Sequence, residues 1–137
     1  MADLEALARE THKFESRYLD GLLGPYPEAR EVYRQRSPIH HVDELSRPLI
    51  VLQGLEDEVV PPNQSEMIVQ ALRTKGVPVA YLAFEGEQHG FRRAENIRQS
   101  MDAELSFYAQ VLGFPLPEEE GIQPTEVENR SSIDTGD

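Results

Sequence analysis

The chain has 137 residues, with 25 Asp and Glu against 13 Lys and Arg, a net charge of −12 and no Cys. The acidic excess repels phosphate backbones and anionic lipids, which argues against nucleic acid or a membrane as partner. The lack of Cys excludes disulfides, thiolate zinc sites and a cysteine nucleophile. The acidic N-terminus is unlike a secretory signal, and the longest aliphatic run is only Leu49 to Leu52, so we expect a soluble, cytoplasmic protein.

The first third of the chain shows short helical patterns. A first helix is predicted around Leu4 and Leu7, which share one helical face, and a second over residues 14–23, where apolar side chains recur at spacings of three and four. A glycine and two prolines then break the chain. A third short helix over residues 28–36 ends at a Ser-Pro step, because the residue before proline is pushed out of the helical region.

The middle of the chain reads as strand, helix and strand. Residues 48–53 form a short apolar run, which is typical of a strand buried on both faces of a parallel sheet. Asn63 followed by Glu66 predicts a helix start, and Gly76 predicts its end. Val79–Phe84 then supplies a second strand.

A last helix is predicted over residues 92–112, where apolar side chains recur at steps of three and four. The resulting β-α-β-α order implies a crossover connection between parallel strands and an α/β fold.

The remaining residues form an acidic tail. Residues 118–137 carry half of the net charge and almost nothing apolar to bury. Such a segment cannot offset the entropy lost on ordering, so we divide the chain into a core over residues 1–114 and a disordered tail over residues 115–137.

The loops after the two strands carry the candidate site residues. In open α/β sheets, catalytic groups gather just beyond the carboxyl ends of the strands. The first loop places Asp57 three residues after a glycine, and the second places His89 close to glycines on either side. A His with a carboxylate to orient it makes two of the three parts of a nucleophile, base and orienter arrangement. Asp before His also fits the chain order Ser, Asp, His of α/β-hydrolases.

Glu56 and Glu58 flank Asp57 and could compete for its role. Like charges so close raise one another's pKa, so a single carboxylate facing the His is the favoured arrangement.

Three segments carry a resemblance to a known family, and these are Ser37-Pro-Ile-His-His-Val-Asp43, Gly54-Leu-Glu-Asp57 with Val60-Pro61, and Gly86-Glu-Gln-His-Gly-Phe91. Together they resemble the end of the catalytic domain in prolyl oligopeptidase family serine peptidases, in particular the dipeptidyl aminopeptidase and acylaminoacyl peptidase branch. The resemblance covers residues 2–114. It implies a partial α/β-hydrolase fold, hydrolysis of short peptides through an acyl-enzyme, and no cofactor. It also implies that Asp57 is the orienting carboxylate and His89 the general base.

The nucleophile that this chemistry needs is missing from the sequence. None of the eight serines has a glycine two residues before and two residues after it, and no His-Gly-Gly run is present for an oxyanion hole. In the resembling family both features lie upstream, as does a β-propeller. We therefore expect the chain to be roughly the last third of a catalytic domain, inactive when isolated.

The first strand would then have an unpaired edge. We expect that edge to pair with the upstream part of the domain or, in its absence, with another copy of the chain.

Two other functions stay open from the sequence. An orphaned half-domain could be a non-catalytic interaction module whose acidic tail meets a basic partner, or the complete protein could be an esterase, since fold and triad do not choose between ester and amide. His40, His41 and Asp43 suggest a metal site, but sequence neighbours point apart, so we assign them structural or surface roles and expect no metal.

Overall fold

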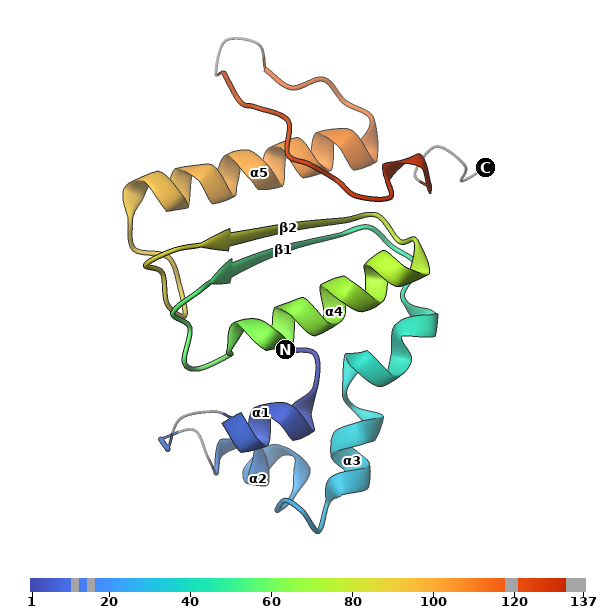
Figure 1. The fold of residues 1–137 in the computed structure, drawn as a ribbon, viewed down its shortest axis with the longest axis vertical. Coiled ribbons are helices and arrows are strands. Elements are labelled where there is room, and N and C mark those ends of the chain that lie inside the picture. Colours follow the sequence, from blue (N-terminus) through green and yellow to red (C-terminus); the bar gives the residue numbers. More distant parts are fainter. Residues whose placement is uncertain (11–12, 15–16, 118–120, 133–137) are drawn as a thin grey trace.

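A computed structural model describes residues 1–10, 13–14, 17–117 and 121–132 (Figure 1). Its elements, in chain order, are α1 (Leu4–Glu10), α2 (Tyr18–Leu23), α3 (Arg30–Gln35), the 3-10 helix η1 (Pro38–Glu44), β1 (Leu49–Gly54), α4 (Pro62–Lys75), β2 (Val79–Phe84), α5 (Ala94–Leu112) and the 3-10 turn η3 (Arg130–Ser132).

The two strands form a parallel pair with α4 as the crossover between them. Their register runs from Leu49 beside Val79 to Gly54 beside Phe84, so both strands end at the same level. Figure 1 shows α4 on one face of this pair and α5 on the other. The predicted α/β class and both predicted strands are therefore confirmed.

The main hydrophobic core lies between α4 and the sheet. Val69, Leu72, Val77 and Val79 are almost completely buried and pack together. Helix α4 thus covers one face of the pair, as helical crossovers usually do. Residues 49–52 of β1 are only half-buried, so the predicted burial of this strand on both faces is wrong for the chain by itself.

A second, separate core lies among the N-terminal helices. Leu4, Leu7, Leu19 and Tyr33 form this cluster, and Figure 1 places it beyond α4, away from the sheet. The buried side chain of Gln64 in α4 links the two regions, since its Oε1 accepts hydrogen bonds of 2.9 Å from the amides of residues 2 and 3.

The predicted helix over residues 14–23 is shorter than expected. Helix α2 begins only at Tyr18, and residues 15–16 lie outside the described part of the chain. Phe14, Tyr18 and Leu22 are 84%, 63% and 60% exposed, whereas Leu19 is buried. The predicted apolar face is therefore only partly confirmed: Leu19 is buried and Leu23 packs against the N-terminal core, but the six-residue helix leaves Tyr18 and Leu22 exposed.

The predicted cap at the start of α4 is wrong, although a helix does begin at this place. The helix begins at Pro62 with Pro61 at the N-cap, and Asn63 makes no cap hydrogen bond but donates to the carboxylate of Glu10 at 2.5 Å. Proline at the first helical position needs no amide partner and has its φ already set, so no side-chain cap is required. The predicted end is confirmed, because Gly76 has a left-handed φ of +80°.

The described part of the C-terminal segment packs against the core. Residues 121–132 run back along α5, and Glu128 exchanges two backbone hydrogen bonds with Val79, of 2.9 and 3.1 Å. The amide of Thr125 also donates to Ser106 Oγ at 2.7 Å. This differs from the expected disordered tail, because polar partners on α5 and β2 supply the contacts that the segment's composition lacks. Residues 118–120 and 133–137 lie outside the described part.

Within the described ranges, no helix has the length and apolar character needed to cross a membrane.

Candidate active site

The loops that follow β1 and β2 lie against each other at one end of the sheet. Since both strands are parallel and end at the same level, their carboxyl ends open on the same side. The amide of Leu55 donates to the carbonyl of Phe84 at 3.0 Å, and the amide of Glu56 donates to the carbonyl of Glu87 at 2.9 Å. Backbone hydrogen bonds therefore join the loop that carries Asp57 to the loop that carries His89.

Gly54 allows this close approach. A Cβ at this position would lie 2.5 Å from the carbonyl oxygen of Gln88 and 2.6 Å from that of Glu87. Both are backbone atoms, so they cannot move aside as a flexible side chain would. The glycine three residues before Asp57 is therefore required by the packing of the second loop.

Asp57 is held in place by its own loop. Its side chain is only 8% exposed, and Oδ1 accepts hydrogen bonds from the amides of Val59 at 2.9 Å and Val60 at 2.8 Å. These contacts orient the carboxylate and leave its second oxygen, Oδ2, to face the neighbouring loop.

His89 meets that second oxygen. Its Nδ1 lies 2.9 Å from Asp57 Oδ2, while 57% of the imidazole side chain is exposed. A carboxylate accepts hydrogen bonds, so the contact places the ring proton on Nδ1 and leaves the Nε2 lone pair free to take a proton. The structure thus brings together the two residues that the sequence singles out, in the geometry of an oriented base.

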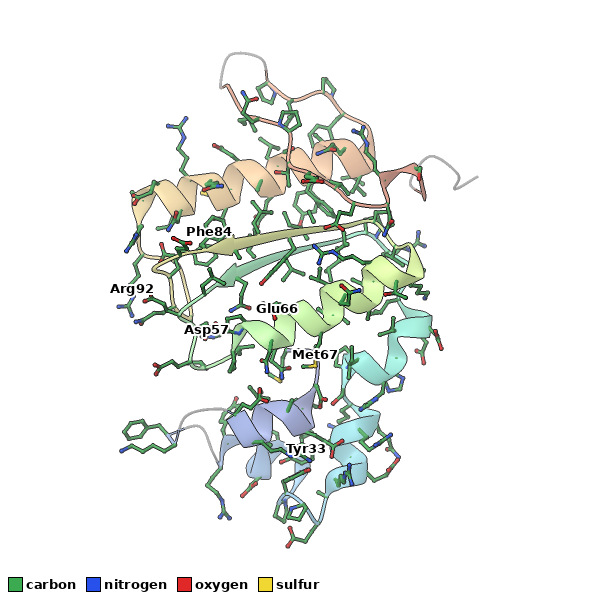
Figure 2. All side chains as sticks on the ribbon, in the orientation of Figure 1. Tyr33, Asp57, Glu66, Met67, Phe84 and Arg92 are labelled. Carbon is green, nitrogen blue, oxygen red and sulfur yellow. The ribbon has the colours of Figure 1, made fainter. Side chains whose placement is uncertain are left out.

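The neighbouring carboxylates do not share this position. Glu56 and Glu58 are both exposed, whereas Asp57 is buried and contacts His89. Figure 2 shows Asp57 close to the start of α4, with Arg92 at the outer edge of the same end of the sheet. Arg92 and Arg93 are exposed beside the candidate base.

An open pocket of about 500 Å³ lies beside this pair. It follows β1 from Ile50 to Gly54 and reaches Asp57 and His89. A pocket beside an oriented base is suited to hold a substrate.

Gln53 is a supporting residue that the sequence analysis missed. This buried side chain donates to the carbonyls of Gly54 at 2.8 Å and Val60 at 3.3 Å, and it accepts from Ser65 Oγ at 2.5 Å. It therefore fastens the Asp57 loop to α4. The available signal was a polar residue at the end of an apolar strand, directly before a glycine.

Glu87 is the second supporting residue that was missed. It is 1% exposed, and its carboxylate accepts from the amides of Arg92 and Arg93 and from the side chain of Asn96. Burial raises the pKa of Glu87, but these hydrogen bonds and the charge of Arg93 outweigh burial, so the pKa lies below its ordinary value of 4.5.

Among the described residues, one group of potential metal ligands lies in the N-terminal part of the chain. Asp3, Glu5 and His40 come within 4.8 Å of one another, but Glu5 is bonded to Arg30 at 2.6 Å. His41 contacts the Glu44 carboxylate and a backbone carbonyl instead. Glu5 and His41 thus have structural partners of their own.

A solved structure shares this arrangement of elements. The structure matches a solved Mycobacterium tuberculosis puromycin-hydrolyzing peptidase with a TM-score of 0.86 and 49% identity, over 93% of this chain and 19% of that one. This likeness confirms the predicted partial α/β-hydrolase fold.

Two sequence relatives extend the comparison. The dipeptidyl aminopeptidase BIII of Pseudoxanthomonas mexicana is 39% identical over 58% of this chain and 12% of its own length. The esterase LipC of M. tuberculosis is 36% identical over 50% of this chain and 17% of its own length. The chain therefore spans less than a fifth of each of these three proteins.

A family comparison covers the whole predicted core. The prolyl oligopeptidase family matches residues 1–114, which include both strands, their loops and α5. The chain therefore belongs to the prolyl oligopeptidase family of serine peptidases.

Proposed function

We propose that this chain supplies the general base, His89, and its orienting carboxylate, Asp57, to a serine peptidase that hydrolyses short peptides through an acyl-enzyme. The observation that carries the proposal is the 2.9 Å contact between His89 Nδ1 and Asp57 Oδ2. Membership of the prolyl oligopeptidase family supports the same reaction class.

In this mechanism His89 Nε2 takes the proton of a serine hydroxyl while the serine oxygen attacks the peptide carbonyl carbon. Asp57 stabilises the resulting imidazolium through Nδ1–H. His89 then gives the proton to the leaving amine as the peptide C–N bond breaks, which leaves an acyl-serine. Water cleaves the acyl-serine by the same proton transfers in a second round.

The serine nucleophile, in our proposal, comes from outside these 137 residues. Ser65 lies in the same pocket as His89, but it belongs to α4 and its hydroxyl donates to Gln53. The loop geometry of a nucleophile elbow is thus not available to Ser65.

The outer edge of β1 offers the place where this other part would join. Among the described strands, β1 pairs only with β2, and the pocket beside Asp57 and His89 runs along β1. A further parallel strand on that edge would bring its own carboxyl end, and a serine on the loop after it, to the same side of the sheet. An upstream part of the catalytic domain, or another copy of the chain, would complete the edge.

A chimera tests the proposal. This chain would replace the matching part of the M. tuberculosis peptidase, and we expect the product to hydrolyse puromycin. Asp57→Asn should lower kcat by about 10⁴-fold and His89→Ala by at least as much, because base and orienter act as one unit. Exposed Glu58→Gln is the matched control, with unchanged kcat expected.

The outcomes separate the alternatives. A folded chimera whose hydrolysis is unaffected by His89→Ala contradicts the proposal and favours a non-catalytic module. Cleavage of p-nitrophenyl esters but of no amide substrate would favour an esterase. The isolated chain should not react with a fluorophosphonate probe. Labelling of the isolated chain would contradict the proposal that the nucleophile comes from outside it.

A further inference from the structure

The orientation of the His89 ring depends on how its loop is anchored. More than half of the imidazole side chain is exposed, and its contact with Asp57 is the one hydrogen bond that orients it among the described residues. The next residue, Gly90, has a φ of +101°, a conformation that most other residues avoid. Another group in the loop must therefore fix the position from which the ring reaches Asp57.

Glu87 has the burial and the contacts for this purpose. It lies two residues before His89 and is 1% exposed. Oε2 accepts from the amide of Arg92 at 2.8 Å, and Oε1 accepts from the amide of Arg93 at 3.0 Å and from Asn96 Nδ2 at 2.9 Å. Three donors thus converge on one carboxylate, so both of its oxygens are used.

These donors belong to the start of α5. Arg93 is the N-cap residue and makes no side-chain cap hydrogen bond of its own. The Glu87 carboxylate takes that place, and its negative charge is favourable at the positive end of the 19-residue helix. The chain on both sides of His89 is therefore closed into a loop by one side chain.

The backbone of Glu87 makes the link to the other loop. Its carbonyl accepts from the amide of Glu56, directly before Asp57, at 2.9 Å. One residue thus holds the start of α5 through its side chain and the Asp57 loop through its backbone.

We infer that Glu87 is a positioning residue, which fixes the His89 loop so that Nδ1 points at Asp57. The inference rests on the proposed function, because it assigns Glu87 a task only if that pair is the working base and orienter. Charge and shape both matter, since a glutamine would turn an N–H donor toward one of the amide donors of Arg92 and Arg93.

The test follows the neutral His89 ring in the ¹⁵N-labelled 137-residue chain, using long-range ¹H–¹⁵N correlations that distinguish the two tautomers. In the parent protein the Nδ1–H form should dominate. Glu87→Gln should lower its share by about twofold or more, because the bond to Asp57 sets the tautomer. The amide signals of β1 and α4 should stay unchanged. Glu85→Gln, an exposed residue of the same loop, is the matched control and should have no effect.

Asp57→Asn separates the two ideas. If it changes the tautomer and Glu87→Gln does not, the positioning role is overturned and the Asp57–His89 pair stands. If Asp57→Asn changes nothing, the proposed function itself fails. Should Glu87→Gln not fold, Asn96→Ala decides, since it removes one donor and keeps the carboxylate: a smaller shift in the same direction supports the inference, and an unchanged tautomer overturns it.

Discussion

The helical region, residues 1–47, and the sheet region, residues 48–117, use buried polar side chains in different ways. In the helical region Ser37 is fully buried, and its hydroxyl accepts from the amide of Leu4 at 2.9 Å and donates to the carbonyl of Tyr33 at 2.7 Å. Such contacts join one helix to another. They hold the helices together.

In the sheet region three of the buried polar side chains lie together at one end. Gln53, Asp57 and Glu87 all lie at or just beyond the carboxyl ends of the two strands, and each fixes a loop. Burial of a charged group is therefore not by itself a sign of function. The useful sign is what the buried group fixes, and in the sheet region these groups fix the backbone around the exposed His89.

The largest effect should come from truncating the two hydrophobic cores. Leu72→Ala, in the sheet region, and Leu7→Ala, in the helical region, should each cost about 3 kcal/mol of local stability through lost burial and a cavity. Leu72→Ala should also weaken the site loops, because α4 packs on both strands. Leu7→Ala should leave them intact. Amide hydrogen exchange measures both effects.

Equal loss of protection in both regions after Leu7→Ala would show that the two regions do not unfold independently. It would mean that the hydrogen bonds of Gln64 to the N-terminal amides make the two cores one cooperative unit.

The sequence predicts the sheet region better than the helical one, for physical reasons. The strands are continuous apolar runs, and a parallel pair obliges the loops after them to meet, so the proximity of Asp57 and His89 follows from local pattern and fold class. Helix α2 has six residues, and whether Tyr18 faces the core depends on packing that no local pattern encodes. Glu87 was missed for the same reason, since two of its three partners are backbone amides.

A smaller effect is expected from two buried carboxylates, one in each region. Burial raises the pKa of Glu5, but the hydrogen bond and charge of Arg30, with a contribution from Tyr26, outweigh it. The pKa values of Glu5 and Glu87 thus both lie below the ordinary 4.5. Below pH 4.5 the unfolded chain binds more protons, so the stability that these groups contribute is present above that pH and is lost as the pH falls through the folded pKa.

Urea unfolding at decreasing pH checks this expectation. Glu5→Gln and Glu87→Gln should each reduce the acid sensitivity of the unfolding midpoint, whereas exposed Glu85→Gln should not. Only Glu87→Gln should also alter the His89 ring. If Glu5→Gln also alters the His89 ring, then a buried carboxylate of the helical region affects the site, and the two regions do not have separate tasks.

The smallest effect is expected where the C-terminal segment meets the sheet region. Glu128 accepts from Arg73 Nε at 2.8 Å and from Nη2 at 2.7 Å, and this contact raises the pKa of Arg73. Both side chains are more than a third exposed, so solvent screens the pair and Glu128→Gln should cost only about 0.5 kcal/mol of unfolding free energy. Urea unfolding measures that cost.

The local consequence should be larger than the global one. The Glu128 amide donates to the carbonyl of Val79, so release of the ion pair should speed hydrogen exchange at that amide. Glu126→Gln removes an exposed charge two residues earlier and should not. Added salt should reproduce the Glu128→Gln effect, because it screens the same pair. If neither Glu128→Gln nor added salt changes the hydrogen exchange of the Glu128 amide, then the backbone pairing with Val79 alone holds this acidic segment. The composition of the segment predicts a solvated end.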